Sequence, residues 1–77
     1  MTYRYTIFEQ QLFEEHIGYY RTFGIEGCVR TDSGWQPCIR LPDVSVDREF
    51  AHWLAGRCTS SQISPVHLKD AVLDALP

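Results

Sequence analysis

Apolar and polar side chains alternate along the first half of the chain. Residues 3–8 are rich in aromatic and β-branched types and alternate over most of their length, which predicts a half-buried strand. Residues 15–30 carry apolar side chains at odd positions, and Ile39 and Leu41 resume that pattern after the turn-forming residues 31–34. We expect three antiparallel strands in a meander, with the odd-numbered side chains facing inward.

The turns predict which residues lie opposite one another. A first turn in the polar residues 10–14 places Ile7 opposite Ile17. The second turn, which contains Gly and short polar side chains, places Leu41 opposite Ile25. Both hairpins then have the same odd face turned inward.

Helical spacing begins after residues 42–43, where Pro and Asp are expected to end the sheet. Ser45 is a good N-cap for a first helix, and Gly56 lies near its expected end. The predicted inward stripe of this helix consists of Val46, Phe50, Trp53 and Leu54, with Arg57 adding its aliphatic stem.

The last segment carries the clearest helix start signal. Ser64 is the expected N-cap, Pro65 is the first helical residue, and Ile63 packs on Leu68 as a hydrophobic staple. The prediction is one α+β domain over residues 1–77, a three-stranded antiparallel meander with two C-terminal helices packed on one face, in the order βββαα. The apolar face of the last helix comprises Leu68, Val72, Ala75 and Leu76.

Composition and charge narrow the possible functions. The chain has 77 residues, of which 44% are apolar, enough for one modest core. The net charge is −3, and six Arg and one Lys are scattered along the chain, so no basic block is present to bind nucleic acid or an anionic membrane surface. No segment has the pattern of a signal peptide or of a membrane span. We therefore expect a cytoplasmic protein with neither nucleic acid nor membrane as a partner.

The cysteines fit a reducing compartment. Cys28, Cys38 and Cys58 are odd in number and include no Cys-x-x-Cys pair, so we expect free thiols. Cys28 and Cys38 lie nearly opposite one another in the predicted hairpin. Cys58, beyond the first helix, is expected to be small apolar filler.

Two stretches together resemble an uncharacterised family of short bacterial proteins. One is Tyr-Arg-Thr-Phe-Gly-Ile at residues 20–25, similar to a family strand reading Tyr-Thr-x-Tyr-Gly-Ile. The other is Ile-Ser-Pro-Val-His-Leu-Lys-Asp-Ala-Val-Leu-Asp at residues 63–74, similar to a terminal helix reading Leu-Ser-Pro-x-His-Leu-x-Asp-Val-Val-x-Asp. The chain departs from these patterns at Phe23 and Ala71. The resemblance implies a domain of unknown function, with no activity, cofactor or catalytic residue to carry over.

The even face of the predicted sheet is the candidate functional surface, because the helices cover only the odd face. Its Tyr, Arg and apolar side chains are of the types enriched in protein interfaces. Our leading hypothesis is a non-enzymatic protein that associates through this face, as a homodimer or with another cytosolic protein. The even face is expected to carry Arg4 and Thr22 together with the candidate binding residues Phe8, His16, Tyr20, Cys28, Arg30, Cys38 and Arg40.

Two alternatives stay open. A small-ligand or metal-binding regulatory domain would use His16, Cys28 and Cys38, although a tetrahedral zinc site would then be one ligand short. An enzyme with a site completed across a dimer would have only His16, His67 and scattered acids as proton-transfer groups. No nucleophile elbow or glycine-rich phosphate loop is present, so we expect no catalytic residue, cofactor or metal.

A polar ridge on the last helix has two interpretations. His67, Asp70 and Asp74 recur at helical spacing and are suited to bind a partner or a metal. Acidic side chains on the outer face of a helix are also ordinary solvated groups, and that interpretation is favoured.

Overall fold

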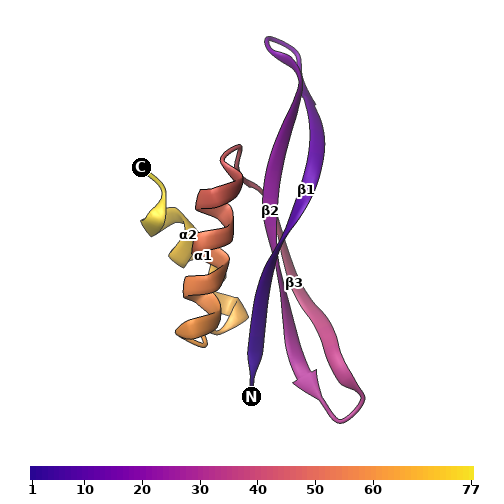
Figure 1. Cartoon of the computed structure of the whole chain (residues 1–77), viewed down its shortest axis with the longest axis vertical. Helices are drawn as coiled ribbons and strands as arrows, with labels where there is room; N and C mark the ends of the chain where they lie inside the picture. Colours follow the sequence, from indigo (N-terminus) through magenta and orange to yellow (C-terminus); the bar gives the residue numbers. More distant parts are fainter.

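The computed structural model describes all of residues 1–77 and contains one antiparallel sheet followed by two helices (Figure 1). Its strands are β1 (Tyr3–Glu14), β2 (Gly18–Thr31) and β3 (Gly34–Ser45), with β2 in the centre. The helices are α1 (Arg48–Ser60) and α2 (Leu68–Ala75), and α2 is preceded by a 3₁₀ turn, η1 (Pro65–His67). The predicted α+β fold with the order βββαα is confirmed.

The first hairpin is longer than predicted, and the turn at residues 10–14 is wrong. β1 continues through these residues, so Ile7 pairs with Ile25. The chain reverses at residues 15–17, where the Glu14 carboxylate accepts hydrogen bonds from the backbone N–H groups of His16 at 2.7 Å and Ile17 at 3.1 Å. Gly18 completes the reversal with a φ of 79°, a conformation that costs glycine little. Polar side chains at 10–14 did not mark a turn, because an exposed strand accommodates them as well.

The second hairpin has the predicted register in the part away from its turn, where Leu41 pairs with Ile25 and Ile39 pairs with Gly27. The sheet does not end at residues 42–43, however, because β3 runs on to Ser45. Between Leu41 and Ser45 the pairing of β3 with β2 shifts by two residues. Asp43 lies in this bulge with a φ of 51°, and the regular alternation of faces is broken there. As a result the even-numbered Val44 is turned inward and buried.

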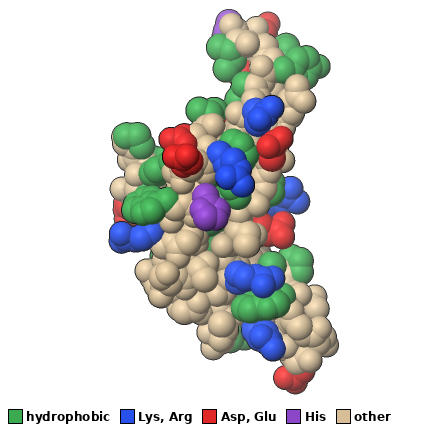
Figure 2. All heavy atoms as spheres, viewed as in Figure 1, with side chains coloured by type: hydrophobic (Ala, Val, Ile, Leu, Met, Phe, Trp, Pro, Cys, Tyr) green, Lys and Arg blue, Asp and Glu red, His purple; other side chains and the backbone are tan.

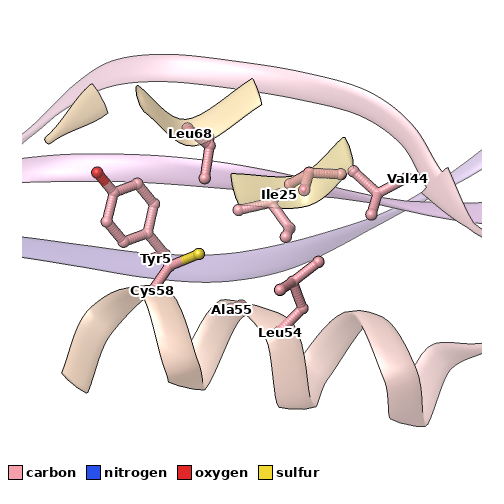
Figure 3. Close-up of a cluster of buried hydrophobic side chains, with 8 residues drawn as sticks. Tyr5, Ile25, Val44, Leu54, Ala55, Cys58 and Leu68 are labelled. Carbon is pink, nitrogen blue, oxygen red and sulfur yellow. The ribbon is translucent and has the colours of Figure 1, made fainter. Parts of the chain in front are cut away.

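The apolar cluster lies between the sheet and both helices (Figure 3). Tyr5, Ile25 and Val44 come from the strands, and the remaining members are Leu54, Ala55, Cys58, Leu68 and Val72. Up to Leu41, the strand residues in or packed against this cluster all lie at odd positions, as predicted: Tyr3, Tyr5, Ile7, Ile25, Ile39 and Leu41. The prediction is wrong nearer the first turn, where the odd-numbered Phe13, Ile17 and Tyr19 are 63%, 68% and 73% exposed because the helices do not reach that far. Ile63 packs against the same cluster as Leu68, in agreement with the predicted staple.

The inward face of α1 differs from the predicted stripe. Its buried residues are Ala51, Leu54, Ala55 and Cys58, whereas Val46 is 67% exposed and Trp53 is 50% exposed. Alanine side chains let a helix backbone lie close to the sheet, and at that distance bulkier side chains are accommodated on the flanks. Cys58 is buried apolar filler as expected, but it lies within the helix, which continues past Gly56 to Ser60.

The helix starts differ in how they are capped. Asp47, not the predicted Ser45, caps α1, because its Oδ1 accepts from the backbone N–H groups of Glu49 at 3.0 Å and Phe50 at 3.3 Å. Ser64 does precede the 3₁₀ turn and Pro65 begins it, but the Ser64 side chain makes no capping hydrogen bond. The proline therefore marks this start better than the serine does.

The end of α1 is hydrogen-bonded to the outer edge of β1. The Gln62 side chain accepts from the Tyr3 N–H and donates to the Tyr3 carbonyl, both at 2.8 Å. The Thr59 hydroxyl accepts from the Tyr5 N–H at 2.9 Å and lies 3.2 Å from the Tyr5 carbonyl oxygen. These two side chains satisfy backbone groups that a neighbouring strand would otherwise bind.

Candidate interaction surface on the open sheet face

One face of the sheet has no helix against it, since α1 and α2 lie together on the other side (Figure 1). Side chains alternate between the two faces of a strand, so most even-numbered strand residues point to this surface, which we call the open face. The predicted binding residues that lie at these positions are Phe8, Tyr20, Cys28, Arg30 and Arg40.

A register shift adds Trp35 to the open face. Partway along β2 the pairing with β3 shifts by one residue, so that Arg30 pairs with Trp35. The guanidinium carbon of Arg4 lies 4.4 Å from the centre of the indole ring and that of Arg30 lies 5.6 Å from it, both within the range of cation–π attraction. Sequence analysis missed Trp35 because its odd number assigned it to the inner face. Pro37, which has no N–H for the ladder, was the available signal for a bulge.

Arg40 and Phe8 form a second contact of the same kind. The Arg40 guanidinium carbon lies 3.9 Å from the centre of the Phe8 ring, and its Nη1 lies 3.8 Å from Glu26 Oε2. Phe8 lies directly over Gly24, where an added Cβ would collide with the ring. The absence of a side chain at Gly24 therefore lets the aromatic ring lie against the β2 backbone.

The two contacts differ in charge balance. Arg40 has the carboxylate of Glu26 beside it, and the other salt bridge of the chain joins Arg21 to Glu9. Arg4 and Arg30 have no carboxylate within salt-bridge distance. The part of the open face around Trp35 thus presents two unpaired positive charges beside an aromatic ring.

At the other end of the open face, polar side chains converge on Asp43. The Thr22 hydroxyl donates to Asp43 Oδ1 at 2.8 Å, and the Tyr20 hydroxyl donates to Oδ2 at 3.2 Å. The Asp43 N–H in turn donates to Gln10 Oε1 at 2.9 Å. Desolvation, followed by the hydrogen bond to Asp43, raises the pKa of Tyr20 above its ordinary value. These bonds hold the left-handed residue of the β3 bulge, which gives the cluster a structural role.

The predicted ligand set of His16, Cys28 and Cys38 is not brought together. His16 lies in the β1–β2 turn, whereas Cys28 pairs with Arg4 near the other end of β1, about 33 Å away at the usual rise of a strand. Cys28 pairs with Pro37 and not with Cys38, because of the register shift. Desolvation, and then the charge of Cys28, raises the pKa of Cys38 and so disfavours the thiolate that binds metals. No group of three or more His, Cys, Asp or Glu side chains is arranged to hold a metal ion.

The ridge on η1 and α2 faces solvent. His67, Asp70 and Asp74 are exposed, and no hydrogen bond or salt bridge joins them. Asp74 lines a groove of about 370 Å³ between α1 and α2 together with Trp53 and Arg57, and the Arg57 guanidinium carbon lies 5.3 Å from the centre of the Trp53 indole ring. Only Asp74 of the three ridge residues lines this groove, so the ridge does not form a common site.

The comparisons with known proteins supply a family and nothing further. A protein-family model matches the chain over residues 1–77, and the family that it represents has no assigned function. No curated protein and no solved structure matches the chain. Neither helix is long and apolar enough to cross a membrane.

Proposed function

The chain belongs along its whole length to a family of unknown function (DUF6514), and we propose that it is a non-enzymatic protein that binds another protein through its open face. The supporting observation is Trp35 between Arg4 and Arg30, neither of which has a carboxylate partner. Trp and Arg dominate the energetics of protein interfaces. A guanidinium group also binds carboxylates through paired, charge-assisted hydrogen bonds.

The shape of the open face favours a protein over a small ligand. Small-molecule sites are concave and enclose most of the ligand surface. None of the five cavities of this molecule is lined by Arg4, Phe8, Arg30, Trp35 or Arg40. A protein partner, by contrast, can bind a sheet face that has no cavity, as one sheet does when it packs face to face on another. The proposal includes no catalytic residue, cofactor or metal.

The charge of the open face indicates the chemistry of the partner. An Asp or Glu side chain placed between Arg4 and Arg30 would neutralise both, with an apolar group against Trp35. We therefore place an acidic segment of another cytoplasmic protein on this face. A second copy across the same face, the homodimer expected from the sequence, is a separate outcome of the same test.

The test compares proteins retained from a cell lysate by the immobilised chain and by two variants. We expect Arg4→Glu combined with Arg30→Glu to lose a partner that the wild type and the control Arg48→Glu both retain. Arg48 is an exposed residue of α1 with no salt bridge, so the control changes charge away from the open face.

The retained partner is then purified and titrated against a Trp53→Phe variant, in which Trp35 is the sole indole. Binding at the open face changes Trp35 fluorescence, and added salt weakens it because the contact is charge-assisted. The proposal is wrong if all three baits retain the same proteins, or if binding leaves Trp35 fluorescence unchanged. If the immobilised chain retains only further copies of itself, the partner is a second copy of this chain.

A further inference from the structure

The outer edge of β1 is only half covered. Tyr3 and Tyr5 direct their backbone groups away from β2, where Gln62 and Thr59 bind them. Thr2, at an even position, instead directs its carbonyl to Arg30 on β2. Backbone groups alternate in direction along an edge strand, so the next odd residues also point outward. No helix residue or side chain hydrogen-bonds the outward backbone groups of Ile7, Glu9, Gln11 and Phe13.

The other edge of the sheet is protected along its length. β3 contains Pro37 and Pro42, which donate no backbone hydrogen bond, and two register shifts that include the left-handed Asp43. Prolines and bulges are the usual devices against pairing with a second chain. Residues 7–13 of β1 contain no proline, glycine or lysine and pair with β2 without a register shift. This stretch is thus a regular, open edge in a molecule that protects its other edge.

The open stretch is nearly symmetric about its centre. Residues 7–13 read Ile-Phe-Glu-Gln-Gln-Leu-Phe, in which two apolar residues and one polar residue flank Gln10 on each side. If two such strands pair antiparallel about Gln10, Ile7 lies opposite Phe13 of the second copy. The outward-pointing residues then face one another as hydrogen-bonded pairs, and each donates one backbone hydrogen bond and accepts one. Apolar residues meet apolar residues, and Glu9 meets a neutral glutamine.

A cavity lies where Phe13 of the second copy would be placed. Cross-strand neighbours project to the same face of a sheet, so that ring would lie beside Ile7 on the helix side. A cavity of about 260 Å³ occurs there, lined by Ile7, His52 and Gly56 among others. Gly56 leaves room, since nothing lies within 4 Å of a Cβ built on it. Phe13 itself is 63% exposed and is therefore available to fill the cavity.

We propose that a second copy of this chain pairs its β1 antiparallel with β1 over residues 7–13, so that two sheets become one six-stranded sheet. The two-fold axis passes through the Gln10 pair, and each Phe13 enters the cavity beside Ile7 of the other copy. Both pairs of helices lie on one side, and the two open faces join into one continuous surface. The β1 edge is separate from the open face, so this pairing goes beyond the proposed partner binding.

The first test is light scattering coupled to size exclusion. We expect the wild type to reach twice its chain mass of 8.9 kDa with rising concentration. Gln11→Pro removes one outward N–H and places its ring against the incoming strand, so it should stay monomeric. Gln11→Ala keeps the N–H and should still dimerise. Circular dichroism verifies that both variants are folded.

The second test fixes the register and does not depend on the proline variant. In a chain with Cys28 and Cys38 replaced by serine, Gln10→Cys should form a covalent dimer on oxidation with diamide, because the two Gln10 Cα atoms lie within disulfide range at the two-fold axis. Thr6→Cys lies on the same strand and face but opposite Glu14 of the second copy, so it should remain uncrosslinked.

Several outcomes would overturn the pairing and leave the proposed function intact. These are a monomer at every concentration, a dimer that Gln11→Pro does not weaken, and crosslinking by Thr6→Cys in preference to Gln10→Cys. A dimer that is lost with Trp35→Ala but kept with Gln11→Pro would place the second copy on the open face instead. Partner loss with the Arg4 and Arg30 variants tests the open face independently of all of these.

Discussion

Tyr5 connects three parts of the fold. Its ring belongs to the apolar cluster and is 3% exposed. Its hydroxyl donates to the Ile63 carbonyl at 2.5 Å, and its backbone groups lie against Thr59. The residue therefore joins β1, the end of α1 and the segment that leads to η1.

Replacing Tyr5 by Phe keeps the ring and removes the hydroxyl. The Ile63 carbonyl then loses its donor in a partly buried setting, so we expect the free energy of unfolding to fall by about 1–2 kcal/mol. Urea denaturation measures the difference. Tyr19→Phe is the control, because Tyr19 is 73% exposed and its hydroxyl makes no hydrogen bond. Equal stability of both variants would contradict a structural role for the Tyr5 hydroxyl.

Ionisation of the Tyr5 hydroxyl should lower the stability of the fold at high pH. Burial, with smaller effects from Cys38, Cys58 and Tyr3, raises the pKa of Tyr5 from 10.0 to about 12. Between these values the unfolded chain releases the proton and the folded chain keeps it, so the free energy of unfolding falls as the pH rises from about 10 to about 12. Urea denaturation at a series of pH values measures this slope. Tyr5→Phe should show a shallower decline over that window, and equal slopes would show that this phenol does not contribute.

The N-terminus of α1 is held by a side-chain cap and by a second hydrogen bond to the cap residue. Asp47 binds two backbone N–H groups of the first turn, while the Ser45 hydroxyl accepts from the Asp47 N–H at 3.0 Å. A carboxylate here also interacts favourably with the positive end of the helix dipole. Because α1 carries Leu54, Ala55 and Cys58 into the apolar cluster, loss of the cap affects the whole fold.

We expect Asp47→Ala to lower the free energy of unfolding by about 1 kcal/mol, the usual cost of losing an N-cap. Asp47→Asn keeps an acceptor oxygen and should retain most of the stability. Thermal and urea denaturation of both variants measure the effect. A larger loss for Ser45→Ala than for Asp47→Ala would instead support Ser45, the cap predicted from the sequence.

On the scale of the whole molecule, the sheet extends beyond the helices at both hairpin turns (Figure 1). The molecule measures 45 × 26 × 20 Å, and the upper end in Figure 2 gathers histidine, acidic and hydrophobic side chains around the β1–β2 turn. The core is thus central, whereas the edge of β1 and the open face remain accessible over much of the long axis. Only the first residues of that edge are covered, because Gln62 and Thr59 hydrogen-bond the backbone groups of Tyr3 and Tyr5.

Removing this closure should change both stability and assembly. We expect Thr59→Val combined with Gln62→Ala to lower the free energy of unfolding by about 1–3 kcal/mol, because the backbone groups of Tyr3 and Tyr5 lose their partners. The longer open edge should also promote assemblies larger than a dimer. Urea denaturation and light scattering measure the two effects. Ser60→Ala with Ser61→Ala is the control on neighbouring exposed hydroxyls, and identical behaviour of the two double variants would contradict the proposed protection.

Much of the candidate surface could be anticipated from the sequence. The alternation of apolar side chains is a local property of each strand, and it correctly assigned Phe8, Arg30 and Arg40 to the face opposite the helices. Trp35 was assigned to the wrong face, because a single bulge exchanges the inward and outward faces for the strand residues between it and the turn. His16 was misplaced for a related reason, since the position of the first turn decides whether it lies in a strand or at the tip.

The sequence by itself determined the three strands, the inward face of β1 and β2 where the helices cover them, the second turn and the helical start at Pro65. These follow from side-chain periodicity and from the backbone limits of glycine and proline, which act over a few residues. Only the tertiary structure decided the inward face of α1, the cap at Asp47, the protection of β1 by Thr59 and Gln62, and the meeting of two arginines at Trp35. Each of these depends on how closely segments that are distant in the sequence approach one another. A pattern within a few residues contains no information on that distance.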